Sequence, residues 1–281
     1  MMKNLIRFLP NTLFWFFKSK TSKGNKGKLP DFLIIGTQKS GTTSLWANLR
    51  QHKDIEMSPY FKPDPEESKN TKEVHFFDYD KNWYKTKAWY KQLFNDNNKL
   101  QGEATPTYIL FPESCKRMYK TVPNAKLIIV LRNPVTRAYS AFNHYNQGYK
   151  KNKNVKKWDW YLPGASFEEN ILAEKKDKYK KGIARTGFYI NQIKEILKYY
   201  PREQIHIIIA ERMKKNMKKT YKEVYEFLGV KQFMQKFLRK IQTRRYKEPI
   251  KTSTANMLEK LYSPYNKKLF AFLGYKIKEW K

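Results

Sequence analysis

The chain has 281 residues, of which 40% are hydrophobic and 16% aromatic, so it carries enough apolar side chains for a sizeable core in one or two domains. That composition excludes a disordered protein, and the single cysteine, Cys115, excludes a disulfide-rich secreted scaffold. With 58 Lys and Arg against 25 Asp and Glu, the net charge of +33 indicates an anionic partner: nucleic acid, acidic lipid, polyanionic sugar or a phosphorylated cofactor.

The first 29 residues differ in character from the rest of the chain. Residues 5–17 are apolar, but Pro10 interrupts them and they fall short of the roughly 18–20 residues that a membrane span needs. A weak peripheral contact with a membrane and a flap packed on the protein both remain open for this run. Residues 18–30 are rich in Lys, Gly and Ser and are typical of a linker. We therefore predict an arm and basic linker over 1–29 and one folded domain over 30–281.

Apolar runs alternate with helical patterns along that domain. We predict a buried strand over 32–36 followed by a helix over 42–52, further strands over 126–131 and 204–210, and weaker strands over 73–77 and 100–103. Helical patterns cover residues 89–94, 113–119, 134–147, 167–174, 189–200, 214–228 and 256–272. Such alternation predicts an α/β fold, a single domain with a central, mainly parallel sheet flanked by helices.

The loop between the first strand and its helix predicts a phosphate site. Such a strand-loop-helix turn presents backbone N–H groups and the positive end of a helix to an anion. Its candidate ligand residues are Thr37, Gln38, Lys39, Ser40, Gly41, Thr42 and Thr43. Gly36 and Gly41 have the spacing of a nucleotide-triphosphate loop, but Thr42 stands in place of its Lys. The strand over 126–131 also runs into Arg132 rather than the Asp that helps to hold magnesium. The loop is thus P-loop-like, without two usual supports of a magnesium-nucleotide site.

Three other segments carry candidate chemistry. Arg132 follows a buried strand and Ser140 lies along the next helix, where they suit a second phosphate. If residues 73–77 are extended, Glu73 and His75 share a face and can take a proton from an acceptor hydroxyl. Glu103, in a polar loop, is either an acceptor-binding group or a buried structural carboxylate.

Six segments together carry a resemblance to a known family: FLIIGTQKSGTTSL, KEVHFFD, GEATPTY, LIIVLRNPVTRAYS, RTGFY and SPYNKKLFAFLG. Over residues 30–280 the chain resembles the sulfotransferases that use 3′-phosphoadenosine 5′-phosphosulfate, above all the heparan-sulfate-type branch and its bacterial relatives. The resemblance implies in-line transfer of a sulfuryl group to a hydroxyl or amine of a carbohydrate or glycan, without a metal. A glutamate acts as general base in that reaction, and adenosine 3′,5′-bisphosphate is the second product.

The resemblance also implies roles for individual residues. The loop over 37–43 matches the cofactor's phosphosulfate site, with Lys39 at the bridging oxygen, and Arg132 and Ser140 match the 3′-phosphate site. Glu73 matches the general base, with His75 and Lys72 beside it. The match places Arg185 and Tyr189 near the cofactor and assigns Lys72 and Glu103 to the acceptor.

The chain departs from the family at two points. Ala104 stands where the animal O-sulfotransferases carry a Lys, and one cysteine cannot form the disulfide of the Golgi members. We therefore expect a bacterial-type, cytoplasmic enzyme, and the charge favours an acidic acceptor. Three alternatives stay open: a nucleotide kinase, a basic nucleic-acid-binding protein for which no specific motif is present, and a pseudoenzyme that binds the nucleotide without turnover.

Overall fold

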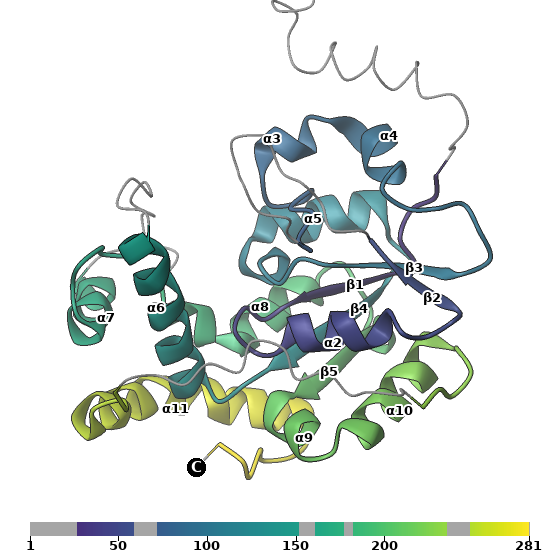
Figure 1. The fold of residues 1–281 in the computed structure, drawn as a ribbon. Helices are drawn as coiled ribbons and strands as arrows, with labels where there is room; N and C mark the ends of the chain where they lie inside the picture. The colour runs from purple at the N-terminus through teal and green to yellow at the C-terminus, as the bar shows by residue number, and fades with distance from the viewer. Residues whose placement is uncertain (1–26, 59–71, 152–160, 177–181, 235–247, 281) are drawn as a thin grey trace, which may run out of the picture.

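The computed structural model describes residues 27–58, 72–151, 161–176, 182–234 and 248–280 (Figure 1). The apolar run over 5–17 and most of the linker lie outside these residues, so the division at residue 30 stays a prediction. None of the helices in the described part of the chain has the length and apolarity needed to cross a membrane.

One five-stranded sheet forms the centre of the molecule, and every neighbouring pair of its strands is parallel. Its strands, in the order β2-β3-β1-β4-β5, are β1 (Phe32–Gly36), β2 (Ile55–Met57), β3 (Leu100–Ala104), β4 (Lys126–Leu131) and β5 (Ile205–Ile209). This arrangement confirms the predicted α/β class with a parallel sheet. The strands predicted over 32–36, 126–131 and 204–210 are present as β1, β4 and β5.

Both faces of the sheet are covered, which is why β1 and β4 are almost continuously apolar. Because side chains alternate along a strand, Leu33 and Ile35 enter one apolar cluster while Phe32 and Ile34 enter another. We call these the first and the second cluster. A third cluster, which includes Ala138, lies among helices beside the sheet.

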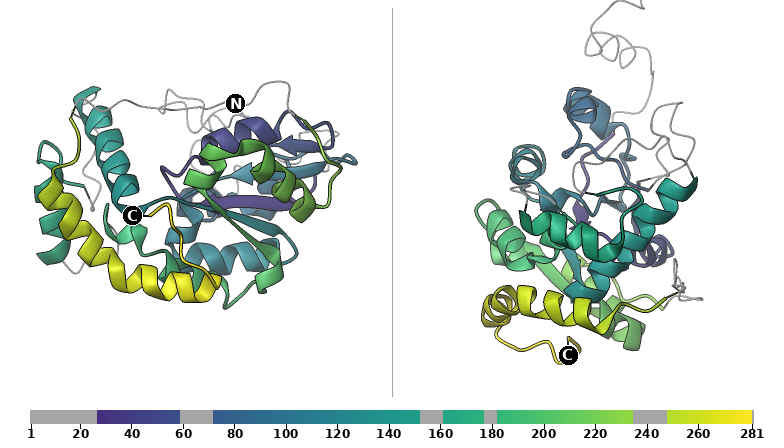
Figure 2. Two further views of the ribbon diagram at one scale, coloured as in Figure 1. Left: turned by 90° about the horizontal axis from the view of Figure 1, so that it is seen from below. Right: turned by 90° about the vertical axis from the view of Figure 1, so that its left-hand side faces the viewer.

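The helices fall into three groups that match these clusters (Figure 2). The second cluster is closed by α2 (Thr42–Leu49), α9 (Ala210–Lys215) and α10 (Met217–Leu228). The first cluster is closed by α4 (Thr86–Lys91), α5 (Pro112–Thr121), α8 (Tyr189–Ile196) and the later part of α11 (Thr252–Leu273). The third cluster joins α6 (Pro134–Lys151), α7 (Phe167–Lys176) and the earlier part of α11.

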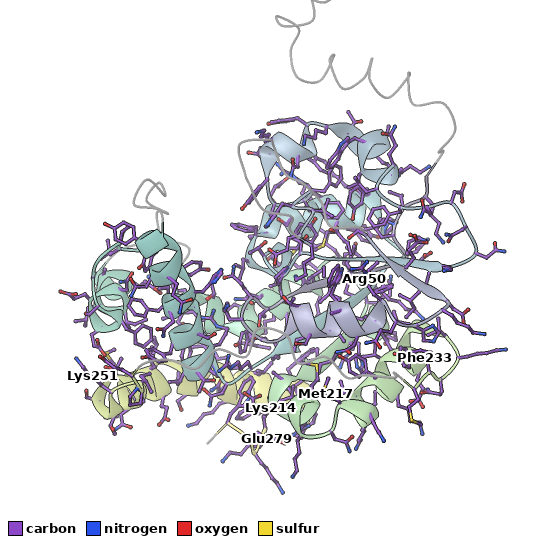
Figure 3. The ribbon with its side chains drawn as sticks, in the orientation of Figure 1. Arg50, Lys214, Met217, Phe233, Lys251 and Glu279 are labelled. Carbon is purple, nitrogen blue, oxygen red and sulfur yellow. The ribbon has the colours of Figure 1, made fainter. Side chains whose placement is uncertain are left out.

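Two residues labelled in Figure 3, Met217 and Lys251, illustrate how these groups are held. Met217, at the start of α10, is buried in the second cluster with Trp46 of α2. Lys251, directly before α11, forms an ion pair with Glu168 of α7, with Nζ and Oε2 separated by 3.8 Å. Such an exposed pair contributes little to stability, so the buried side chains dominate the packing.

The strand predicted over 73–77 is wrong. These residues form a turn before the short helix α3 (Asp80–Trp83), and His75 has a φ of 52°, which no strand residue adopts. The adjacent side chains of Phe76 and Phe77 both enter the first cluster, whereas a strand would send them to opposite faces.

Two further differences have local causes. The three-residue strand β2 was not predicted, because Ile-Glu-Met is too short to show a pattern. The helix predicted over 214–228 divides into α9 and α10 at Asn216, whose Oδ1 accepts a hydrogen bond from the N–H of Lys219 at 3.0 Å. That side chain caps α10, so Asn216 starts a new helix instead of continuing the old one.

Candidate active site

The predicted phosphate loop and its partner residues meet at the carboxyl ends of β3, β1 and β4, which are neighbours in the sheet. Thr37 follows β1, Arg132 follows β4 and Thr105 follows β3. Ligands of open parallel sheets bind at this edge, because the loops after the strands converge there.

The loop after β1 is fastened to β4 and leaves the start of α2 open. The N–H and the Oγ1 of Thr37 both donate to the carbonyl of Val130 at 2.9 Å, and Thr37 Oγ1 lies 2.6 Å from Ser40 Oγ. Lys39 and Gly41 adopt φ values of 70° and 99°, which turn the chain into the helix. Among the described residues, no side chain caps α2 and no acid lies in its first turn. These features fit an anion held by backbone N–H groups.

The close packing under the loop explains Gly36. A Cβ atom at this position would lie 2.7 Å from Cγ2 of Ile109, closer than such atoms approach. Ile109 belongs to the short 3₁₀ helix η2 (Tyr108–Leu110) that follows β3. The floor of the loop is therefore built by the segment that leads away from the neighbouring strand.

Arg132 ties the end of β4 to the phosphate loop. Its Nη1 donates to the carbonyl of Lys39 at 3.1 Å, and its Nε donates to Thr136 Oγ1 at 3.0 Å. The hydroxyl of Tyr189 donates to the Arg132 carbonyl at 2.8 Å, so α8 supports the same point. Ser140 is buried about two turns further along α6. The structure thus brings Arg132 and Tyr189 to the loop, as expected from the sequence.

Glu73 and His75 lie together even though no strand holds them. Lys72 Nζ donates to Glu73 Oε1 at 3.1 Å, and His75 Nε2 lies 3.3 Å from Glu73 Oε2. On its other side, His75 Nδ1 lies 3.0 Å from Asp78 Oδ2. Lys72 also donates to the carbonyl of Ala104 at 3.2 Å, so its ammonium group reaches the position where the resemblance leads one to expect a Lys.

The charges in this cluster support one another. Burial raises the pKa of Glu73, but the charge of Lys72 and the hydrogen bond from His75 outweigh it and hold the pKa at about 2. Burial lowers the pKa of His75, but hydrogen bonds and charges from Asp78 and Glu73 outweigh it and raise the pKa to about 9. At neutral pH the cluster therefore holds an ionised carboxylate beside an imidazolium whose two nitrogens both donate.

Two tyrosines that the sequence did not single out contact the site, Tyr145 at the loop and Tyr79 at His75. The hydroxyl of Tyr145, on α6, donates to Gln38 Oε1 of the loop. Burial raises the pKa of Tyr145, and the charge of Glu73 raises it further. The ring therefore bonds the loop and also lies within electrostatic reach of Glu73. Tyr79 stacks on His75 with ring centroids 4.2 Å apart and is 51% exposed. Neither tyrosine carried a signal in the sequence, whereas Asp78, which contacts His75, ends the motif KEVHFFD that was already singled out.

The predicted contact of Glu103 with an acceptor is wrong. Its side chain is completely buried, and it accepts hydrogen bonds from Thr105 Oγ1 at 3.2 Å, from the Tyr108 hydroxyl at 3.0 Å and from the Tyr90 hydroxyl. Burial raises the pKa of Glu103 to about 7. The alternative, a buried structural carboxylate, is the one that the structure supports.

Arg185 is bonded to α7. Its Nη2 donates to the carbonyl of Glu174 in α7 at 3.1 Å, and its own N–H donates to the Glu174 carboxylate at 3.2 Å. These bonds place Arg185 among the helices of the third cluster. Its short helix η3 (Arg185–Gly187) still packs on α6 through Gly187, where a Cβ would lie 3.1 Å from Pro134 Cβ.

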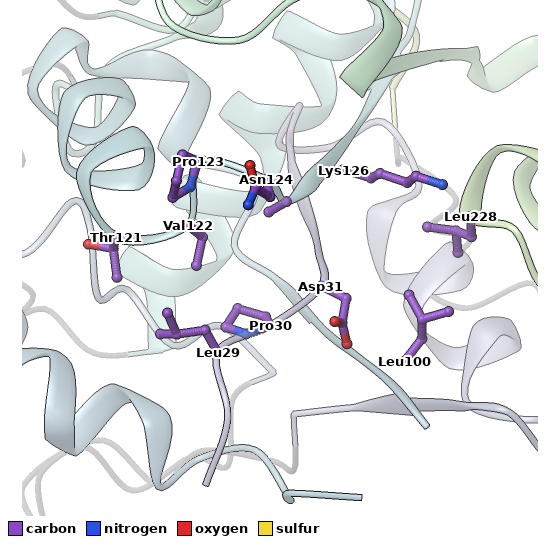
Figure 4. A pocket seen from close by; sticks show the side chains of 11 residues that line it. Leu29, Pro30, Asp31, Leu100, Thr121, Val122, Pro123, Asn124, Lys126 and Leu228 are labelled. Carbon is purple, nitrogen blue, oxygen red and sulfur yellow. The ribbon is translucent and has the colours of Figure 1, made fainter. Parts of the chain in front are cut away.

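Two cavities are lined by residues other than those of the phosphate loop and the Glu73 cluster. A cavity of about 380 Å³ lies at the amino ends of the strands, where Asp31, Leu100 and Lys126 line it (Figure 4). A second cavity, of about 510 Å³, lies beside β5 and α10. In the described ranges, no group of three or more His, Cys, Asp or Glu side chains is placed to hold a metal ion.

Comparisons with known proteins find similar sequences along most of the chain. The family model of the sulfotransferase domain matches residues 29–278. The chain is 33% identical over 189 residues to the heparan sulfate glucosamine 3-O-sulfotransferase 5 of Mus musculus, covering 66% of this chain and 49% of that protein. It is 32% identical over 212 residues to the bifunctional heparan sulfate N-deacetylase/N-sulfotransferase 3 of Mus musculus, covering 72% of this chain and 22% of that protein. The chain thus spans half or less of the length of these relatives.

The fold also resembles a solved structure over almost its whole length. The crystal structure of a sulfotransferase from Alicyclobacillus acidocaldarius superimposes with a TM-score of 0.69 and 26% sequence identity. The match covers 90% of this chain and 99% of the other. The sheet and its flanking helices therefore agree with an experimentally determined architecture.

Proposed function

This chain belongs to the sulfotransferase domain family, and on that premise we propose that it transfers a sulfuryl group to a hydroxyl or amine of a glycan. The observation that carries the proposal is the shared position of two features. A phosphate loop follows β1, and the ion-paired carboxylate of Glu73 is held beside the end of β3, its neighbour in the sheet.

The donor in this proposal is 3′-phosphoadenosine 5′-phosphosulfate. When bound, it supplies the activated sulfuryl group and departs as adenosine 3′,5′-bisphosphate. The uncapped start of α2 and residues 37–43 suit its 5′ end, and Lys39 offsets negative charge there. Arg132 and Ser140 suit its 3′-phosphate, because a guanidinium group binds phosphate oxygens with two parallel hydrogen bonds.

Glu73 acts as proton acceptor in this proposal. Its pKa of about 2 keeps the carboxylate ionised throughout the physiological range, so an oxygen can accept a proton, but the same low pKa makes the paired carboxylate a weak base. The imidazolium of His75 and the ammonium of Lys72 hold the two carboxylate oxygens in place. Since the ordering of these groups precedes the reaction, it lowers the barrier by positioning rather than by covalent chemistry.

An acidic glycan is the acceptor that we propose. The net charge of +33 attracts a polyanion, and the two Mus musculus relatives act on heparan sulfate according to their names. A reducing, cytoplasmic location also stays a proposal, supported by a single cysteine that is buried and has no second cysteine to pair with. Membrane contact by residues 5–17 is tested by binding to anionic vesicles before and after their removal.

Calorimetry without magnesium tests the donor. We expect adenosine 3′,5′-bisphosphate to bind and ADP to bind far more weakly, because ADP has no 3′-phosphate. Magnesium-ATP is the control for the kinase alternative, and preferential binding of magnesium-ATP would overturn the proposal. Binding of neither nucleotide would overturn the phosphate site itself.

Turnover of the variant Glu73→Gln tests the base. We expect this variant to bind the bisphosphate normally and to lose most sulfuryl transfer to an acidic glycan panel. Glu113→Gln is the matched control, because Glu113 is an exposed carboxylate that pairs with Arg117 at 3.4 Å on α5. Wild-type transfer by Glu73→Gln would show that the base is another group, whereas binding without any turnover of the wild type would favour the pseudoenzyme.

A further inference from the structure

The turn that carries Glu73 and His75 is held by side chains rather than by a strand ladder. The N–H of Val74 donates to Thr105 Oγ1 at 3.0 Å, and the N–H of Phe76 donates to the Tyr108 hydroxyl at 2.9 Å. These two bonds alternate with the two charged residues, one on each side of His75. Because buried backbone groups require partners, these hydroxyls replace the neighbouring strand that residues 73–77 lack.

Glu103 accepts the protons of the Thr105 and Tyr108 hydroxyls. Thr105 Oγ1 donates to Glu103 Oε2 at 3.2 Å, and the Tyr108 hydroxyl donates to Glu103 Oε1 at 3.0 Å. A hydroxyl has one proton, so a hydroxyl that donates to the carboxylate presents only lone pairs elsewhere. Both oxygens must then accept from the backbone N–H groups of the turn. Because a backbone N–H can only donate, the hydrogen-bond chain runs from the turn through the two hydroxyls to Glu103.

We propose that Glu103, Thr105 and Tyr108, here called the hydroxyl clasp, are positioning residues that set Glu73 and His75 in their reactive geometry. They act through the backbone of residues 74–76 and touch neither substrate nor cofactor. The catalytic part of this inference rests on the proposed function, whereas the part that concerns the placement of His75 does not. This role accounts for Glu103, a buried acid that takes no direct part in the proposed reaction.

Tyr90 provides a matched control for Tyr108. Both hydroxyls donate to Glu103 Oε1, and both side chains are completely buried. Only the Tyr108 hydroxyl also accepts the N–H of Phe76, whereas the Tyr90 ring stacks on the Phe76 ring at 4.2 Å and a Phe at position 90 keeps that stack. Tyr90→Phe therefore removes the same bond to the carboxylate without releasing the turn.

The kinetic test compares these two variants with saturating donor and acceptor. We expect Tyr108→Phe to lower kcat by about tenfold to a hundredfold, since misplacing reacting groups by about 1 Å costs up to about a hundredfold. Its affinity for adenosine 3′,5′-bisphosphate should stay within about twofold of the wild type, because the Tyr108 hydroxyl bonds Phe76 and Glu103 rather than the phosphate loop. Tyr90→Phe should keep kcat within about twofold by the same comparison. Equal loss of kcat in both variants would overturn the inference.

Thr105 gives a second pair of variants in case Tyr108→Phe folds poorly. Thr105→Val removes the hydroxyl and keeps the shape, so we expect a similar loss of kcat. Thr105→Ser restores the hydroxyl without the methyl group and should recover most of the rate. A failure of Ser to recover the rate would indicate that packing, not the hydrogen bond, is what the reaction requires.

The titration of His75, followed by NMR of the imidazole, tests the clasp without any turnover. The charged groups near His75 are Glu73, Asp78 and Lys72, with Thr107 Oγ1 at 3.5 Å from Nδ1 and the Tyr79 ring stacked on its face. A released turn separates His75 from both carboxylates, so its pKa should fall from about 9 toward 6.5 in Tyr108→Phe and stay near 9 in Tyr90→Phe. His75→Asn identifies the signal among the four histidines.

The outcomes separate the two proposals. If the wild type transfers no sulfuryl group, the proposed function fails and the His75 titration alone decides the clasp. An unchanged His75 titration in Tyr108→Phe overturns the clasp whatever the rates are. A shifted titration with unchanged kcat in an active enzyme refutes its catalytic role.

Discussion

The variant Arg132→Met distinguishes two roles of the Arg132 side chain, support of the phosphate loop and binding of the 3′-phosphate. The guanidinium group of Arg132 braces the phosphate loop through the carbonyl of Lys39 at 3.1 Å, and we assign it to the 3′-phosphate of the donor. Methionine keeps much of the apolar stem and removes the charge and the donors. A brace affects every nucleotide that uses the loop, whereas a phosphate contact affects only nucleotides that carry a 3′-phosphate.

The size of each effect can be worked out from the contacts. Loss of the brace removes two hydrogen bonds, to Lys39 and to Thr136, at about 1 kcal/mol each. Loss of a charged phosphate contact costs about 2–5 kcal/mol, and the lower end of about 2–3 kcal/mol applies because Arg132 is half-buried. At about 1.4 kcal/mol per factor of ten, that contact corresponds to about a 30- to 140-fold loss of affinity.

Calorimetry with adenosine 3′,5′-bisphosphate and with 5′-AMP distinguishes these duties. We expect Arg132→Met to reduce the ratio of the two affinities by about 30- to 140-fold. Arg202→Met is the control, because Arg202 lies at the opposite, amino end of β5 and bonds the Ile205 carbonyl. If both nucleotides lose the same factor in Arg132→Met, Arg132 is only a brace and the assignment of the 3′-phosphate is refuted.

Three other predictions concern stability. The pKa of Glu73 is lowered, so its contribution to the stability of the fold is complete above pH 4.5 and is lost as the pH falls through about 2. The pKa of His75 is raised, so its contribution to stability is complete below pH 6.5 and is lost as the pH rises through about 9. The melting temperature should therefore be highest between those two inner values, and an alkaline decline that survives in His75→Asn would contradict this cause. Gly36→Ala should lower the free energy of unfolding, measured in urea, by about 1–3 kcal/mol, because the new methyl group clashes with Ile109. An unchanged free energy of unfolding would mean that Ile109 moves aside without cost. Asn216→Ala should cost about 0.5–2 kcal/mol through loss of the cap of α10, and Asn216→Asp, which keeps a capping oxygen, should cost less.

Strands β1 and β4 could be predicted because each is a short, almost continuous apolar run, as a strand buried on both faces requires, and β5 because it is rich in Ile. The turn over 73–77 could not, since its aromatic residues resemble a strand in composition. Its shape is decided by the hydroxyl clasp, whose members come from residues about thirty positions later in the chain. A local pattern contains no information about such a partner.

The same distinction applies to the site. The phosphate loop and Arg132 were predictable because each comes directly after a strand, and parallel strands bring their succeeding loops to one edge of the sheet. Tyr145 was not, because its hydroxyl meets Gln38 only after α6 has folded back over the loop. Glu103 stood undecided in the sequence, since nothing local shows that Tyr90 and Tyr108 close over it.

The helix α11 completes two apolar clusters whose other members are synthesised earlier. Leu258 and Tyr262 complete the third cluster, while Leu269, further along the same helix, completes the first. On a ribosome, the sheet and α6 emerge well before these side chains do, so two apolar surfaces stay uncovered until residues 252–273 emerge. The nascent chain is therefore most exposed to aggregation and to chaperones just before residues 252–273 leave the exit tunnel.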